Sequence, residues 1–326
     1  MLAPYNQRKI ALLGVPVECG GRESGPAMGP FALRRAGLGA RLAALGYCVE
    51  DHGDLTPIFA PEAQSLHRNI RNLGESAGWT RRLMPAAEAL LHDGVMPVWL
   101  GGDHSLSLGT VAGAAAYAKS VGRPLFVLWL DAHPDFNTFA TTASGNTHGM
   151  SAAFFCGLPG FEALLGRPLE APVDPANVCM IGIRSVDRPE RELLRAHGVR
   201  AHAMAALREC GAERLLEPFL HAVAEANGLL HVSFDVDFLD PGIAPATGTP
   251  VPGGASLTEA RRIMALVRES RLMASLDIAE LNPSLDEGGR TAALTADLAA
   301  GLFGRAATAW RRPARGSPEI HHSPRS

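Results

Sequence analysis

Short apolar runs recur along the chain, separated by longer stretches of helical periodicity. Residues 125–130 are all apolar, which is typical of a strand covered by helices on both faces. Comparable runs predict strands at residues 9–14, 47–50, 96–100, 178–183, 229–234 and 273–278. Helical patterns predict helices at residues 30–45 and 64–91. They also predict two helices that end near residues 121 and 196, and two that begin at residues 257 and 292. This alternation predicts an α/β fold of three layers, α/β/α, around a mostly parallel sheet of roughly eight strands.

The length of the chain and the lack of an obvious linker favour one domain. A chain of 326 residues can bury one large core, and an α/β architecture can hold that core in a single unit. We therefore expect one domain over residues 1–310. Residues 311–326 are rich in Arg, Pro and Ser, a composition that predicts a flexible tail.

Composition narrows the choice of partners and compartment. The formal net charge is −3, so no basic surface indicates a nucleic-acid partner. No apolar run approaches the roughly 18 residues of a membrane span, and the amino terminus has no pattern of a signal peptide. The five cysteines are odd in number and form no Cys-x-x-Cys pair, which indicates a reducing compartment. We expect a cytoplasmic protein that binds neither membranes nor nucleic acid.

The apolar run 125–130 ends abruptly in acids and an imidazole. Asp131, His133 and Asp135 recur at every second position, so an extended backbone places all three side chains on one side. Pro134 favours this, because the residue before a proline is pushed toward the extended region. Such a cluster fits either a hydrogen-bonded polar turn or the ligands of a divalent cation.

Three further predicted strands also end in polar residues. His104, Asp235 with Asp237, and Glu280 each lie at or just past the carboxyl end of a strand, the edge where open α/β sheets bind ligands. Adjacent carboxylates repel unless positive charge lies between them. Four acids and two imidazoles in a small volume suit two divalent ions about 3.5–4 Å apart. His231 is instead interpreted as a hydrogen-bonded core histidine.

Six motifs together resemble the arginase branch of the ureohydrolases, within the wider arginase and deacetylase superfamily. They occur in family order and cover nearly the whole chain. The motifs are Gly-Gly-Asp-His-Ser (101–105), Asp-Ala-His-Pro-Asp-Phe-Asn (131–137), Ser-Gly-Asn-Thr-His-Gly (144–149), Ser-Phe-Asp-Val-Asp-Phe-Leu-Asp-Pro (233–241), Ala-Thr-Gly-Thr-Pro (246–250) and Asp-Ile-Ala-Glu-Leu-Asn-Pro (277–283).

The resemblance implies a binuclear metal site and a homo-oligomer, a trimer or a hexamer. It implies two Mn²⁺ per subunit, with Co²⁺ or another divalent ion as an open alternative. The implied ligands are His104 and Asp135 for one ion, His133 and Asp237 for the other, and Asp131 and Asp235 as bridges.

The resemblance also implies hydrolysis of L-arginine to L-ornithine and urea. A guanidinium is attacked poorly by ordinary water, whereas water on a metal ion loses a proton near neutral pH. By the family match, Asp135 returns a proton to the departing nitrogen and Glu280 pairs with the guanidinium. His148 is expected to shuttle protons, although a simple loop hydrogen bond is its alternative interpretation.

Substrate choice is expected to depend on the loop after Asp135. Family matches suggest Asn137 and Ser144 for the α-carboxylate and Asp187 for the α-ammonium. Agmatine has no carboxylate, so these matches favour arginine over agmatine. The full set of expected substrate contacts is Asn137, Ser144, Asn146, Asp187, Glu190 and Thr249.

Three alternatives stay open on sequence alone. In the first alternative, the substrate is a different guanidino compound, such as agmatine or guanidinobutyrate. The second is an amide hydrolase of the deacetylase type with one zinc ion. In the third, a non-catalytic protein has kept the fold.

Overall fold

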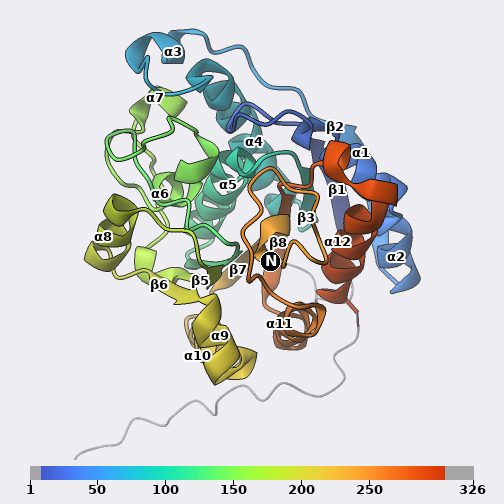
Figure 1. Ribbon diagram of the computed structural model, residues 1–326. Helices are drawn as coiled ribbons and strands as arrows, with labels where there is room; N and C mark the ends of the chain where they lie inside the picture. Colours follow the sequence, from blue (N-terminus) through green and yellow to red (C-terminus); the bar gives the residue numbers. More distant parts are fainter. Residues whose placement is uncertain (1–8, 305–326) are drawn as a thin grey trace, which may run out of the picture.

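The computed structural model describes residues 9–304 and contains one parallel sheet (Figure 1). Within these residues the sheet has eight strands in the order β2-β1-β3-β8-β7-β4-β5-β6, and all neighbouring pairs are parallel. The predicted α/β class is therefore confirmed. The strands are β1 (Lys9–Val15), β2 (Cys48–Asp54), β3 (Met96–Gly101), β4 (Leu125–Leu130), β5 (Val178–Ile183), β6 (Arg200–Ala203), β7 (Leu229–Asp235) and β8 (Met273–Ala279).

The two edge strands are the ones that the apolar pattern describes poorly. β6 was not predicted, because its four residues are mostly exposed and have no apolar run. β2 is longer than the predicted segment 47–50 and ends in polar residues that are exposed. An edge strand is paired on one side only and covered incompletely, so its residues need not be apolar.

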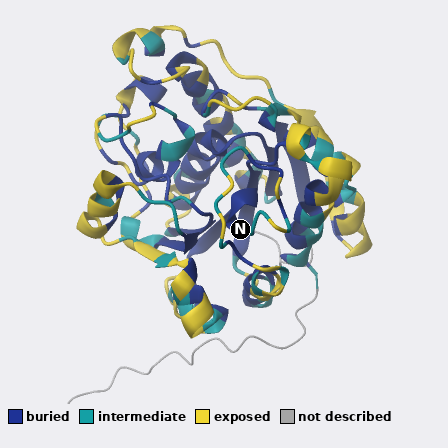
Figure 2. Ribbon diagram, in the orientation of Figure 1, coloured by how far each residue is buried: buried dark blue, intermediate teal, exposed yellow. Residues whose placement is uncertain are grey.

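Helices cover both faces of the sheet. One face carries α1 (Gly29–Arg35), α2 (Leu38–Ala44), α9 (Met204–Cys210), α10 (Ala212–Glu225), α11 (Leu257–Ser270) and α12 (Arg290–Gly301). The other face carries α3 (Glu62–Leu66), α4 (Leu73–His92), α5 (Ser107–Ser120), α6 (Ser151–Phe155), α7 (Glu162–Leu165) and α8 (Arg188–Ala196). Figure 2 shows the strands buried between these layers, while the outer helix surfaces are exposed.

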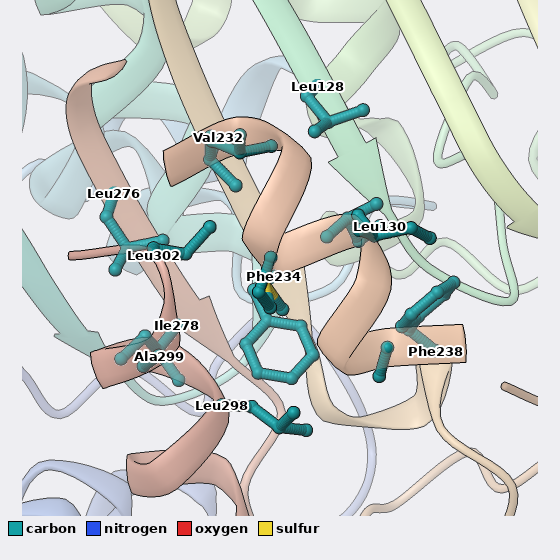
Figure 3. Close-up of a cluster of buried hydrophobic side chains, with 14 of the residues drawn as sticks. Leu128, Leu130, Val232, Phe234, Phe238, Leu276, Ile278, Leu298, Ala299 and Leu302 are labelled. Carbon is teal, nitrogen blue, oxygen red and sulfur yellow. The ribbon is translucent and has the colours of Figure 1, made fainter. Parts of the chain in front are cut away.

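Alternate residues of the central strands enter opposite cores. Leu128 and Leu130 of β4 pack in the core beside α10 to α12, and Figure 3 shows Leu130 near Phe234 in this core. Val127 and Trp129 of the same strand pack in the core beside α4 and α5. Because successive side chains of a strand point to opposite faces, a strand buried on both faces must be apolar at every position.

Two predicted helices are each divided in the structure. The segment 30–45 forms α1 and α2, separated at Gly37, whose φ of +80° is left-handed and suits glycine. The segment 64–91 forms α3 and α4, and Asn72, which precedes α4, also has a positive φ of +44°. Apolar periodicity continues across both breaks because the flanking helices cover the same core.

The predicted tail 311–326 lies outside the described residues. Among residues 9–304, none of the helices combines the length and the apolar character needed to cross a bilayer. The carboxyl ends of β3, β8, β7 and β4, which are neighbours in the sheet, lie side by side at one edge. The loops that follow these four strands form the candidate site.

Candidate metal centre and substrate cavity

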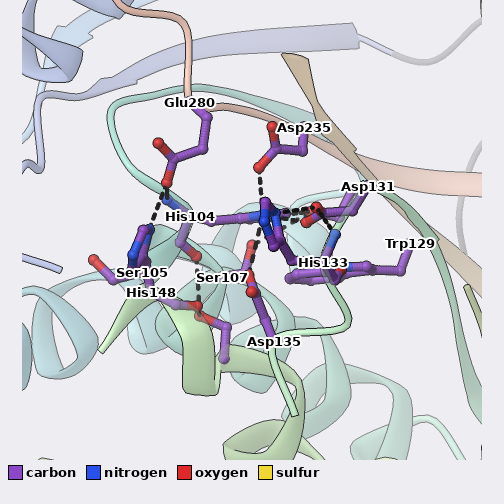
Figure 4. A network of polar contacts seen from close by, with 12 residues as sticks. His104, Ser105, Ser107, Trp129, Asp131, His133, Asp135, His148, Asp235 and Glu280 are labelled. Atoms are coloured by element: carbon purple, nitrogen blue, oxygen red, sulfur yellow. Dashed lines mark hydrogen bonds and ion pairs between the residues drawn. The ribbon is translucent and has the colours of Figure 1, made fainter. Parts of the chain in front are cut away.

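Four adjacent strands bring the expected acids and imidazoles together (Figure 4). His104 begins the turn after β3, and residues 131–135 follow β4. Asp235 ends β7, with Asp237 in the short 3-10 helix that follows, and Glu280 is the residue directly after β8. The expected meeting of these segments at one sheet edge is thus what the structure shows.

One group of donors surrounds the Nδ1 atom of His104. This atom lies 2.9 Å from Asp131 Oδ2, 2.9 Å from Asp235 Oδ2 and 3.4 Å from Asp135 Oδ2. All four side chains are buried. Three carboxylates therefore converge on one imidazole nitrogen away from water.

A second group surrounds the Nδ1 atom of His133. It lies 3.0 Å from Asp237 Oδ2 and 3.5 Å from Asp131 Oδ1. Asp131 thus directs one carboxylate oxygen toward each histidine. Ligand atoms within 4.8 Å of one another form two triads, His104 with Asp131 and Asp135, and Asp131 with His133 and Asp237. The shared member of the two triads is Asp131.

The donor atoms fit divalent cations. His104 Nδ1 and Asp131 Oδ2 are buried, and among the described residues their 2.9 Å contact satisfies them only when the imidazole carries a proton. Such atoms are costly unless something positive or polar satisfies them. Imidazole nitrogen and carboxylate oxygen are ordinary ligands of Mn²⁺, Zn²⁺ and related ions. The two triads are consistent with one ion each.

The pKa values of the clustered acids and imidazoles also indicate that this site requires positive charge. Burial and then the neighbouring Asp131 carboxylate raise the pKa of Asp135 well above its usual value, and burial with Asp237 does the same for the pKa of Asp235. Burial alone would lower the pKa of both histidines, but the facing acids raise the pKa of His104 to about 9 and of His133 to about 12. Protons on the imidazoles thus supply part of the positive charge that cations would supply.

Backbone amides hold the carboxylates in place. Asp131 Oδ1 accepts from the amide of His133 at 2.6 Å, and Asp235 Oδ1 accepts from the amide of Asp237 at 2.7 Å. Asp237 Oδ1 accepts from the amide of Ala132 at 3.0 Å, which ties the two loops together. These bonds fix the carboxylates before any ion binds.

Glu280 and His148 form a pair beside the metal centre. Glu280 Oε1 lies 2.9 Å from His148 Nδ1 and accepts from the amide of His104 at 2.8 Å. Burial opposes the charge on Glu280, but His148 holds the pKa of this carboxyl below its usual value. Conversely, burial would lower the pKa of His148, and Glu280 raises it. His148 Nε2 lies 3.4 Å from Asn146 Nδ2.

The metal centre lies at the base of a cavity of about 590 Å³, a volume that includes its open mouth. Five of the six expected substrate contacts line it, and Asn146 instead lines a neighbouring cavity. Ser185 and Gly149 also line the cavity, although the sequence motifs did not indicate them as cavity residues. Gly149 directly follows the predicted His148, and Ser185 lies two residues before the predicted Asp187, which was the available signal. The cavity is lined by His133, Asp135, Asn137, Ser144, His148, Gly149, Ser185, Asp187, Glu190, Asp235, Thr249 and Glu280.

Several cavity residues also stabilise the loops around it. Asp187 and Glu190 form a capping box at the start of α8, and Glu190 Oε1 accepts from the amide of Phe136 at 2.8 Å. Thr249 Oγ1 donates to Asp237 Oδ2 at 3.0 Å. Glu190 therefore anchors the loop after Asp135 to α8.

Comparisons with known proteins agree with this geometry. The model of the arginase family matches residues 8–304. An arginase from Agrobacterium fabrum is 52% identical over 294 residues, which cover 90% of each chain. The solved structure of Bacillus caldovelox arginase superposes with a TM-score of 0.83 at 34% identity, covering 93% of this chain and all of that one. Entamoeba histolytica arginase in complex with L-ornithine gives 0.80 at 28% identity, covering 92% and 99%. The chain therefore belongs to the arginase family.

Proposed function

We propose that this protein hydrolyses L-arginine to L-ornithine and urea with two divalent cations bound per subunit, and that the native ion is Mn²⁺. The observation that carries the proposal is the position of two His and Asp triads, buried except for the half-buried His133, at the base of a cavity with polar walls. An amino acid with a long cationic side chain matches this arrangement. Its guanidinium reaches the acidic residues at the bottom of the cavity, while its α-carboxylate and α-ammonium stay near the mouth.

The proposed ligands divide between the two triads. His104 and Asp135 would hold one ion, His133 and Asp237 would hold the other, and Asp131 and Asp235 would be shared by both. Two cations in this position would lower the pKa of a water molecule and so supply hydroxide near neutral pH. The spread of Asp131 toward both histidines supports its bridging role.

The chain's own groups orient the guanidinium and move protons. Glu280 is a buried carboxylate on the wall of the cavity and is not among the proposed metal ligands, and a guanidinium forms strong charge-assisted hydrogen bonds with such a group. Asp135, which also lines the cavity, takes up the proton that the attacking water loses and passes it to the departing ornithine nitrogen. His148 exchanges protons between this region and solvent, because its side chain is 18% exposed and its ring contacts Glu280.

The walls of the cavity select the substrate. Asn137 and Ser144 offer neutral polar groups to an α-carboxylate, and Asp187 offers a negative charge to an α-ammonium. Arginine has both groups, agmatine lacks the carboxylate, and 4-guanidinobutyrate lacks the ammonium. Glu190 and Thr249 contribute indirectly, through the loop after Asp135 and through Asp237.

The deciding experiment combines metal analysis with a panel of substrates. Metal-free protein is reconstituted with Mn²⁺, Co²⁺ or Zn²⁺, and urea release is measured from L-arginine, agmatine and 4-guanidinobutyrate. Two ions per chain and a preference for arginine with Mn²⁺ are expected. Preference for agmatine would overturn the choice of substrate. One zinc ion per chain with amide hydrolysis would indicate the deacetylase type, and metal uptake without any turnover would indicate a non-catalytic homologue.

We also propose a homo-oligomer, a trimer or a hexamer, located in the cytoplasm. The odd number of cysteines and the burial of three of them support a reducing compartment. Light scattering of the purified protein measures the subunit number, and fractionation of cells tests the location.

A further inference from the structure

A second cluster of ionisable side chains lies beneath the metal centre, inside the sheet. Asp277 of β8 and His231 of β7 are both fully buried, and neither lines the cavity. A buried charge costs several kcal/mol unless partners compensate for it. The proposed reaction uses neither residue, so their presence requires another explanation.

Asp277 is held mainly through one of its oxygens. Asp277 Oδ2 accepts from Ser107 Oγ and from Thr110 Oγ1, each at 2.7 Å, and lies 3.2 Å from His231 Nε2. His231 Nδ1 lies 2.7 Å from Ser275 Oγ, as expected of a hydrogen-bonded core histidine. The two hydroxyls and His231 together compensate for an ionised carboxylate at this position.

A chain of hydrogen bonds leads from Asp277 to His104. Ser107 Oγ lies 3.5 Å from Ser233 Oγ, which lies 2.8 Å from Nε2 of His104. The opposite ring nitrogen, Nδ1, faces the carboxylates of the metal centre. The His104 ring also stacks on Trp129, with centroids 4.0 Å apart and planes 6° from parallel. Figure 4 shows Ser107 beside this ring.

Because Asp277 only accepts hydrogen bonds when ionised, it gives the chain a direction. Ser107 must direct its hydrogen to Asp277, which leaves its oxygen free to accept from Ser233. Ser233 then accepts from Nε2–H of His104. This order keeps the hydrogen of a neutral His104 on Nε2 and leaves the lone pair of Nδ1 toward the ion. The reverse order would place the hydrogen on Nδ1 and block that ligand.

We propose that Ser107 is a positioning residue for the metal centre. It couples the buried Asp277 to His104 through Ser233, and it thereby keeps Nδ1 of His104 available to one of the two ions. The inference rests on the proposed metal centre but does not depend on the identity of the substrate. It predicts that the two ions are affected unequally, since within residues 9–304 the polar contacts of His133 are with Asp131, Asp237 and Trp129 and not with the hydrogen bonds that lead from Asp277 to His104.

Thr110 provides a matched control. Ser107→Ala and Thr110→Val each remove one hydroxyl that donates to Asp277 Oδ2 over 2.7 Å, but only Ser107 also reaches Ser233. Metal-free proteins are titrated with Mn²⁺ in a calorimeter, without substrate. Ser107→Ala should bind one of the two ions about tenfold more weakly, the lower end of the range for outer-shell partners, whereas Thr110→Val should keep both affinities nearly unchanged.

Further measurements separate this effect from a general loss of structure. Thermal unfolding of the metal-free variants reports on the fold. If Ser107→Ala fails to fold, Ser107→Cys replaces it, because the thiol is slightly larger than the hydroxyl, fills its place and is only a weak hydrogen-bond donor. Equal weakening in Ser107→Ala and Thr110→Val would overturn the proposal, as would equal weakening of both ions or no weakening at all. Failure of the wild-type protein to take up two ions would overturn the proposed metal centre and this inference with it.

Discussion

His148 Nδ1 lies 2.9 Å from Oε1 of Glu280, and this same oxygen accepts the amide of His104. One carboxylate oxygen therefore connects the proposed proton shuttle to the backbone of a proposed metal ligand. Glu280 itself has a left-handed φ of +64° and donates its amide to Gly102 at 2.7 Å. The strained backbone fixes the carboxylate between the two histidines.

This pair predicts separate effects on turnover and metal binding. His148→Asn should lower kcat about 10²-fold to 10⁴-fold, because a proton-transfer group is lost, while Mn²⁺ content stays at the wild-type value. Steady-state kinetics and elemental analysis test this. A variant that raises KM at unchanged kcat would instead indicate that His148 only contacts substrate.

Asp131 should be needed for both ions. Its oxygens face His104 and His133 separately, so Asp131→Ala removes a donor from each triad and should reduce both metal content and turnover. Asp240→Ala is the control, because the hydrogen bonds of the Asp240 carboxylate within residues 9–304 come from the backbone amides of residues 242, 253 and 254 and not from either triad. Normal metal content in Asp131→Ala would show that the bridging role is wrong.

Variants at the proposed carboxylate and ammonium contacts should change the KM of different compounds. Asn137→Ala should raise the KM for L-arginine about tenfold, or about 1.4 kcal/mol, and leave the KM for agmatine nearly unchanged. Asp187→Asn should raise the KM for L-arginine but not for 4-guanidinobutyrate, which has no ammonium group. Asp174→Asn, at the start of a distant 3-10 helix, should change neither. An equal effect on all three compounds would contradict these assignments.

Glu190 should make the stability of the metal-free protein depend on pH. Burial raises the pKa of Glu190 from 4.5 to about 7, so between these values the folded state holds a proton that the unfolded chain releases. The contribution of this group to the free energy of unfolding therefore falls as the pH rises through this window, by up to about 3 kcal/mol.

The matched variants are Glu190→Gln and Glu192→Gln, because the Glu192 side chain is 62% exposed on the same helix. Thermal unfolding is measured from pH 4.5 to 7. The stability of Glu190→Gln should rise relative to wild type across this range, and Glu192→Gln should follow wild type. Parallel curves for all three proteins would exclude the effect.

The five cysteines should differ in reactivity. Cys48 and Cys210 are exposed, whereas Cys19, Cys156 and Cys179 are buried. Burial raises the pKa of Cys179 to about 12 and raises the pKa of Cys19 and Cys156 as well, so their thiolates are scarce. A disulfide reagent should titrate two thiols in the native protein and five in denaturant. Rapid reaction of more than two native thiols would contradict the buried positions.

Local patterns were enough to predict the central strands and the polar residues at their ends. A strand buried on both faces must be apolar at every position, as 125–130 is, and parallel strands bring their carboxyl ends to one edge. For this reason Asp131, Asp235 and Glu280 could be expected near one another before the structure was known. The edge strand β6 escaped prediction because partial exposure removes the apolar signal.

Tertiary structure alone decided which atoms face each other. The sequence contained Ser107, Ser233 and Asp277 on separate segments, but only the pairing of β7 with β8 and the packing of α5 bring them into one hydrogen-bonded chain below His104. It also separated Asn146 from the main cavity and gave Glu190 two backbone amides as partners. Periodicity reports only on neighbours along the chain, whereas hydrogen bonds between distant segments depend on the register and depth at which those segments pack.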